Sequence, residues 1–145
     1  MKGTEEFKRL IPLMESVASC FPPADALVEI NLVGERKMAE LNRVYRRRRG
    51  VSEILTFCYT DDNGSDPGVE SAAGEIYLCW KRLALGARKR RVSKAAYLLR
   101  LLVHGLCHLQ GYRHDDGPSE IRMEKVEKER LRLHLSEGEV ARLFS

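Results

Sequence analysis

The sequence predicts a small protein of the α+β class, with a mixed sheet packed against helices. Three observations lead to this class. Branched and aromatic residues concentrate in three short runs, which is typical of strands, at residues 26–33, 53–59 and 74–80. Apolar residues recur at helical spacing over most of the remaining chain. The composition, 43% hydrophobic and 32% charged, is that of a globular protein with a buried core.

The N-terminal part is predicted to form a helix and then a strand. Apolar residues recur at helical spacing from Glu5 to Cys20, and Phe21-Pro22-Pro23 ends that pattern. Apolar and polar residues then alternate from Ala26 to Val33, which indicates a strand that ends at Gly34.

The middle of the chain is predicted to alternate between regular elements and loops. A short helix is expected from Glu35 to Tyr45, followed by a loop from Arg46 to Gly50. The run from Glu53 to Tyr59 favours a strand, and the polar stretch from Thr60 to Gly74, with its glycine and proline residues, favours a loop. A third strand is expected from Gly74 to Trp80.

The C-terminal part is predicted to be helical. A short helix from Lys81 to Arg88 precedes a strongly apolar one, which Ser93 caps and which runs to Gln110 as the central helix of the fold. Gly111 suits the left-handed turn that ends such a helix. Pro118, with Asp116 or Gly117 as cap, opens a charged helix, so the last two helices are expected at residues 119–135 and 137–144.

Length and composition predict one domain over residues 1–145. No apolar run is long enough for a membrane span or a secretory signal, so we expect a cytoplasmic protein. The four cysteines form no C-x-x-C pair and are interpreted as buried reduced thiols at positions 20, 58, 79 and 107.

The net charge is +4, and the positive excess is concentrated in two clusters. One is Arg46 to Arg49, and the other consists of Arg88, Lys89, Arg90, Arg91 and Lys94. Such clusters can bind phosphates, but surface arginines are more often only solvated, so charge alone does not establish nucleic-acid binding.

Three of the four histidines lie within eleven residues and predict a metal site. His104 and His108 are four residues apart on the predicted central helix, so both imidazoles leave one face. Gly111 allows the chain to turn back and bring His114 to the same ion, a spacing shared with the metzincin zinc enzymes. The fourth, His134, is interpreted as a surface residue.

Three imidazoles and one open position form the usual catalytic zinc arrangement, which makes hydroxide available near neutral pH and therefore indicates hydrolysis. Metzincin peptidases have a glutamate after the first histidine as general base, whereas this chain has Gly105. Phosphodiester cleavage depends less on such a base, because charge neutralisation at the phosphate supplies much of the rate.

The histidine segment resembles the H-G-x-x-H-L-x-G-Y-D-H signature of the bacterial YbeY endoribonucleases, also called ribosomal RNA maturation factors. It reads HGLCHLQGYRH from His104 to His114. Leu41 to Arg46 and Val51 to Phe57 are similar to the family blocks L-N-x-x-Y-R and P-T-D-V-L-S-F, and Gly74-Glu75-Ile76 is similar to G-D-I. The resemblance extends from Leu41 to His114 in the family's order.

This resemblance implies an α+β fold, one zinc ion or another divalent transition metal on the three histidines, and single-strand-specific cleavage of RNA. It implies ribosomal RNA, especially that of the small subunit, as substrate, and a role in ribosome quality control. It further implies that Arg46 faces the metal as a catalytic residue beside His114, where a guanidinium can hold a phosphate by two hydrogen bonds.

The chain departs from the family pattern at several positions. Arg113 replaces an acid beside the third histidine, Val51 replaces a proline and Arg49 an acid, and Glu53 and Glu75 lengthen aspartates. The family's first N-terminal strand is also not visible in the sequence.

Three hypotheses follow. The first is a metal-dependent endoribonuclease that acts on single-stranded ribosomal RNA. The second is a zinc peptidase, which the spacing permits and Gly105 opposes; it would need a base such as Asp115 or Asp116, which are better explained as helix caps. The third is a non-catalytic module in which the metal only stabilises the fold and the basic clusters bind RNA or the ribosome.

Overall fold

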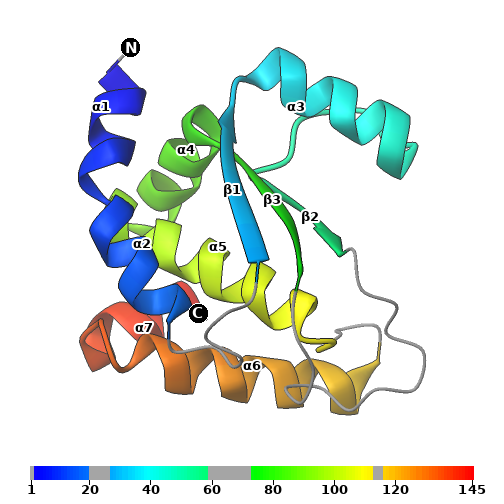
Figure 1. The fold of residues 1–145 in the computed structure, drawn as a ribbon. Coiled ribbons are helices and arrows are strands. Elements are labelled where there is room, and N and C mark those ends of the chain that lie inside the picture. The colour runs from blue at the N-terminus through cyan, green and yellow to red at the C-terminus, as the bar shows by residue number, and fades with distance from the viewer. Residues whose placement is uncertain (1, 20–26, 59–72, 113–115) are drawn as a thin grey trace.

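The computed structural model describes residues 2–19, 27–58, 73–112 and 116–145. Their strands form one three-stranded sheet in the order β1-β3-β2. The strands are β1 (Leu27–Val33), β2 (Ile54–Cys58) and β3 (Ala73–Cys79). β3 is central, parallel to β1 and antiparallel to β2. The predicted α+β class with a small mixed sheet is therefore confirmed (Figure 1).

Helices surround this sheet. In chain order they are α1 (Lys2–Arg9), α2 (Ile11–Ala18), α3 (Glu35–Leu41), the π-helical turn η1 (Asn42–Arg46), α4 (Trp80–Arg90), α5 (Lys94–Leu109), α6 (Gly117–Leu131) and α7 (Glu137–Leu143). The predicted caps of the two longest helices are confirmed. Ser93 Oγ accepts a hydrogen bond from the Ala96 N–H at 3.0 Å, and Asp116 Oδ1 accepts one from the Ser119 N–H at 2.7 Å.

The two faces of the sheet have different coverings because successive strand residues point to opposite sides. α5 lies between one face and α6, as Figure 1 shows, and contacts Ile54 and Ile76. On the other face, Met38 and Leu41 of α3 pack against Leu55 and against residues of β3.

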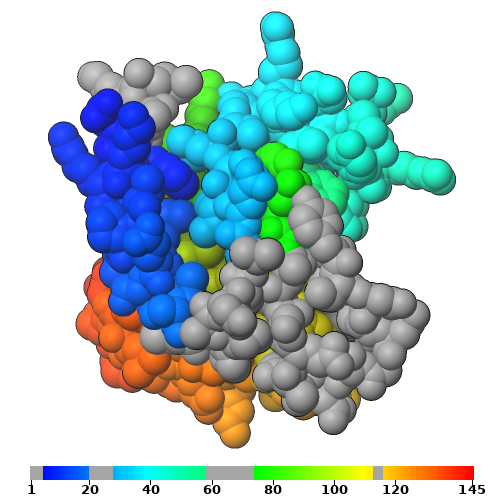
Figure 2. All heavy atoms as spheres, viewed as in Figure 1, coloured from blue at the N-terminus to red at the C-terminus, as the bar shows by residue number. Residues whose placement is uncertain are grey.

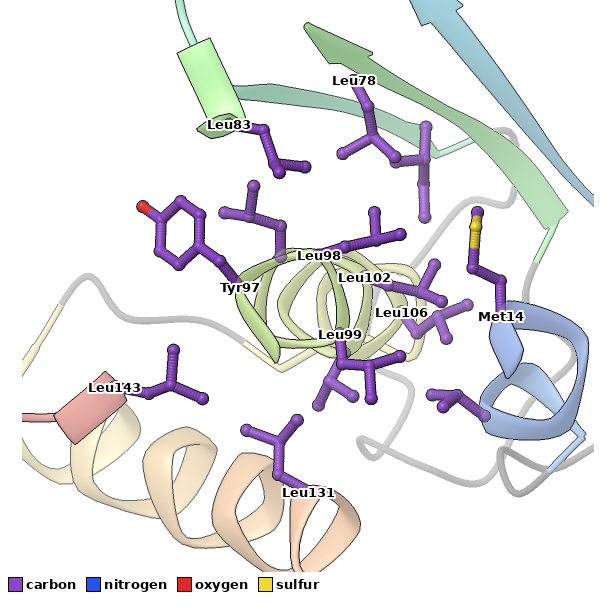
Figure 3. Close-up of a cluster of buried hydrophobic side chains, with 14 of the residues drawn as sticks. Met14, Leu78, Leu83, Tyr97, Leu98, Leu99, Leu102, Leu106, Leu131 and Leu143 are labelled. Carbon is purple, nitrogen blue, oxygen red and sulfur yellow. The ribbon is translucent and has the colours of Figure 1, made fainter. Parts of the chain in front are cut away.

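α5 is the central helix, as predicted, because almost its whole circumference is buried. Figure 3 looks along it, with Leu78 of β3 and Leu83 of α4 on one side and Leu131 of α6 and Leu143 of α7 on the other. Met14 of α2 closes a third side. On the face that Figure 2 shows, only small areas of α5 remain visible, one of them between the N-terminal helices and β1.

One expectation about helices is wrong. The first predicted helix is two helices that break at Leu10, because Pro12 in the first turn of α2 has no N–H to continue the ladder. The helix predicted from Glu35 to Tyr45 is present as α3 followed by η1, and Arg47 ends it with a positive φ of 53°.

His134, interpreted from the sequence as a surface residue, is partly exposed. His134 lies in the turn after α6, and its Nε2 atom is buried without a hydrogen-bond partner among the described residues.

Cys79 and Cys107 are buried free thiols, as expected. The other two cysteine side chains and the predicted loop after β2 lie outside the described part of the chain. In the described ranges, none of the helices has the length and apolar character that crossing a membrane requires.

Candidate metal centre

The candidate site lies at the C-terminal end of α5, where His104 and His108 project from one face of the helix. Their rings are partly exposed, their centroids lie 4.6 Å apart, and their planes are nearly perpendicular at 87°. After Leu109 the helix ends through Gly111, whose φ of +96° confirms the predicted left-handed turn.

Both rings are held on their Nδ1 side. His104 Nδ1 lies 2.9 Å from Glu127 Oε2, and His108 Nδ1 lies 3.1 Å from the carbonyl oxygen of Tyr112. A carbonyl or an ionised carboxylate can only accept, so each Nδ1 carries the proton and each neutral ring keeps a lone pair on Nε2.

The two Nε2 atoms face each other at 3.1 Å. Two lone pairs at that distance repel unless a cation or a proton lies between them. Two nitrogen ligands of one tetrahedral zinc ion are about 3.3 Å apart, because each zinc–nitrogen bond is about 2.0–2.1 Å long. The described residues of the site therefore fit a single transition-metal ion.

Sequence analysis missed Glu127, the acid that orients His104. It is only 4% exposed, and the same Oε2 atom accepts a hydrogen bond from Arg100 at 3.2 Å. A buried carboxylate that fixes the tautomer of a histidine is the usual support of a metal ligand. The sequence does contain a sign of this role. Glu127 lies midway between Met123 and Leu131 on the apolar stripe of α6, where a buried charge needs a partner.

Arg46 lies at the outer edge of the sheet. Its guanidinium donates to the carbonyl oxygen of Thr56 in β2 and lies 5.4 Å from the centre of the Phe57 ring. Thr56 is also the link to α5, since a Cβ atom added to Gly105 would lie 3.2 Å from its hydroxyl oxygen. Arg46 and the helix that carries the histidines thus meet the same strand residue.

The third predicted ligand, His114, lies outside the described residues together with Arg113 and Asp115. Among the residues that are described, no group of three or more histidine, cysteine or acidic side chains is placed to hold a metal. The set that the structure brings together is the pair His104 and His108 with Glu127 behind it.

Two neighbouring groups are unsuited to metal or base chemistry. Burial, with a contribution from the nearby charge of Glu127, raises the pKa of the Cys107 thiol far above its usual range, so it stays protonated at neutral pH. Asp116 serves as the cap of α6, and the hydrogen bond from the Ser119 N–H lowers the pKa of its carboxyl.

A family model described as Endoribonuclease YbeY matches residues 4–134 of this sequence. The chain belongs to the YbeY endoribonuclease family. The recognition drawn from the histidine segment is thereby confirmed.

Relatives named Endoribonuclease YbeY agree with this membership. The chain is 38% identical to that of Cupriavidus metallidurans over 108 residues, which cover 74% of this chain and 52% of the relative. It is 36% identical to that of Thermodesulfovibrio yellowstonii over 110 residues, which cover 75% of this chain and 67% of the relative. The chain thus spans about half the length of the first relative.

A solved structure shares the fold. The solution structure of TM1509 from Thermotoga maritima matches with a TM-score of 0.60 at 25% identity, over 90% of this chain and 82% of that one. The arrangement of helices around a small sheet is therefore common to both proteins.

Proposed function

We propose that this YbeY family member is a metal-dependent endoribonuclease that cuts single-stranded RNA. The observation that carries the proposal is the pair of Nε2 atoms that face each other at 3.1 Å, each on a ring held from behind. The proposed substrate is ribosomal RNA, in its maturation and in ribosome quality control, with the small subunit as partner and the cytoplasm as location. The family membership supports these details.

The proposed metal is one zinc ion or another divalent transition metal, held by His104, His108 and His114. When bound, it supplies a Lewis acid and a water of lowered pKa, near 7 for zinc. The chain's own part is to present neutral imidazoles. Glu127 and the Tyr112 carbonyl do so by keeping both Nδ1 protons in place.

The test is incubation of purified, metal-loaded protein with single-stranded RNA and, separately, with casein, each with and without a chelator. We expect cleavage of RNA that the chelator stops, and intact casein. Cleavage of casein would favour the peptidase hypothesis. Intact RNA with bound metal would favour the non-catalytic module.

Replacing Arg46 with alanine is expected to lower kcat/KM for RNA about 100-fold, as loss of a single charge-stabilising donor does in other enzymes. Arg46 is proposed to hold the phosphate by its guanidinium, so zinc affinity should stay unchanged. The matched control is Arg43→Ala, which removes another exposed arginine of η1. Equal loss in both variants would contradict a specific role for Arg46.

Replacing Glu127 with glutamine is expected to weaken zinc binding roughly tenfold, the lower end of what loss of such a supporting contact costs. The neutral amide no longer stabilises the positive charge that His104 shares with the metal. Competition with a chelating dye measures the affinity. Glu129→Gln on the exposed side of the same helix is the control, and equal affinities of the two variants would remove Glu127 from the site.

A further inference from the structure

Cations of the second basic cluster line a groove, and the first cluster ends two residues before the segment that lines the groove from the other side. The segment 41–52 contains five arginines and no acid, and the segment 80–94 contains seven cationic residues and no acid. The end of the first segment and the residues after it face α4 across a groove of about 850 Å³, which is lined by Val51, Ser52 and Glu53 on one side and Arg82, Arg88 and Lys89 on the other. The cations that line the groove thus come from α4, and the arginines of the first cluster precede its other side directly in the chain.

Most of this charge is not neutralised within the described residues. Arg88, Lys89 and the three arginines at positions 47–49 are exposed, and none forms an ion pair with another described residue. Arg82, in contrast, is paired with Glu35 at 2.9 Å. Uncompensated cations beside a groove attract polyanions.

Glu53, the acid that lines the groove, is hydrogen-bonded to a residue of α5. Both of its carboxylate oxygens lie 2.7 Å from the Tyr97 hydroxyl. Burial and this hydrogen bond raise the pKa of Tyr97, so its hydroxyl remains a donor. Gly86 of α4 lies directly over the pair, because a Cβ atom there would come within 2.1 Å of Glu53 Oε2. Glu53 thus anchors the floor of the groove to α5.

The backbone at both basic clusters already has a defined conformation without a ligand. Asn42, which is 2% exposed, donates from Nδ2 to the Gly50 carbonyl at 3.1 Å and to Ser52 Oγ at 2.9 Å, and so closes the loop that holds the first cluster. Among the described residues, Arg47 and Arg91 are the non-glycine residues with positive φ, at 53° and 57°. Glycine normally occupies such helix ends, so arginine there accepts backbone strain to place a cation.

β2 links the groove to the surroundings of the candidate site. Ile54 lines the groove at the start of the strand, and Thr56, two residues further on, accepts the hydrogen bond from Arg46 and lies beside Gly105 of α5. Two strand residues span about 7 Å. A strand of RNA that occupies the candidate site therefore needs only a few nucleotides to reach the groove.

We infer that the groove between residues 51–54 and α4 binds the phosphodiester backbone of single-stranded RNA a few nucleotides away from the point of cleavage. This inference rests on the proposed function for its ligand. An acidic protein segment would also match the charge, but the link to Arg46 along β2 favours RNA. The exposed Leu85 of α4, which also lines the groove, offers an apolar contact to a base.

The test is binding of a labelled single-stranded RNA of about twelve nucleotides, a length within the range that such grooves occupy, to metal-free protein in a chelator. Fluorescence anisotropy is measured over a series of salt concentrations. The double variant R88A/K89A changes two exposed residues of a helix end. K8A/R9A removes the same charge at the end of α1 and is the matched control.

We expect R88A/K89A to weaken binding roughly tenfold and to reduce the slope of log Kd against log salt by about 1.4, since each phosphate contact to a single strand contributes about 0.7. K8A/R9A should change neither quantity appreciably. Thermal melts check that both variants are folded.

Three results would overturn the proposal that the groove binds RNA. They are equal affinities and salt slopes for the two double variants, no binding of RNA by the parent, and a polyglutamate peptide that binds more tightly than RNA of the same charge. Loss of binding in R88A/K89A, combined with a metal-loaded parent that cuts no RNA, would leave the groove standing and remove the proposed nuclease activity. Conversely, if the metal-loaded parent cuts RNA and R88A/K89A keeps the salt slope of the parent, the nuclease activity would stand and the groove would be removed.

Discussion

Replacing His108 with alanine is expected to lower zinc affinity more than about 100-fold, beyond the cost of losing a supporting contact, and to abolish RNA cleavage. The ring of His104 would then lose the second Nε2 atom, which it now meets at 3.1 Å. Without metal, the variant should be as stable as the parent, because one of two repelling lone pairs is gone. Zinc should raise the melting temperature of the parent and leave that of the variant unchanged.

The measurements are competition with a chelating dye and thermal melts with and without zinc. His134→Ala is the control, since it removes a histidine that lies in the turn after α6. That control is expected to keep the zinc-dependent rise in melting temperature even if the loss of the partly buried ring makes it less stable. A His108→Ala protein that binds zinc like the parent would place the metal elsewhere.

The parts of the site that follow local rules could be predicted from the sequence. The spacing of His104 and His108 puts both on one face of any helix, and Ser93 and Gly111 mark where that helix starts and stops. Asp116 caps the next helix by the same kind of local rule. These predictions hold because each depends on only a few neighbouring residues.

The parts of the structure that depend on contacts between distant residues could not be predicted from the sequence. Glu127 meets His104 only because α6 packs along α5, 23 residues further on in the chain. The groove forms because Gly86 lets α4 approach Glu53, which no local pattern reveals. One local signal was missed as well: the apolar spacing over residues 5–20 predicted one helix, although the missing N–H of Pro12 divides it.

Replacing Gly105 with glutamate is expected to lower the free energy of unfolding by about 3 kcal/mol or more, because it overpacks a close contact and buries a charge. A Cβ atom at this position would lie 3.0 Å from Ile76 Cδ1, 3.2 Å from Thr56 Oγ1 and 3.3 Å from Ile54 Cδ1. The added side chain thus starts against the sheet, and α5 would have to move away from it. Urea unfolding of metal-free protein measures the loss.

Gly138→Glu is the matched control, since it places glutamate in α7, where the nearest atom to an added Cβ is 3.9 Å away. There the change should be neutral or slightly stabilising, because glutamate is a better helix former than glycine. Equal stability of both variants would show that α5 and the sheet have room to spare. The expected difference would give a structural reason for glycine at the position of the metzincin general base. Position 105 is the point where α5 lies against β2 and β3, so a glutamate there would meet the sheet.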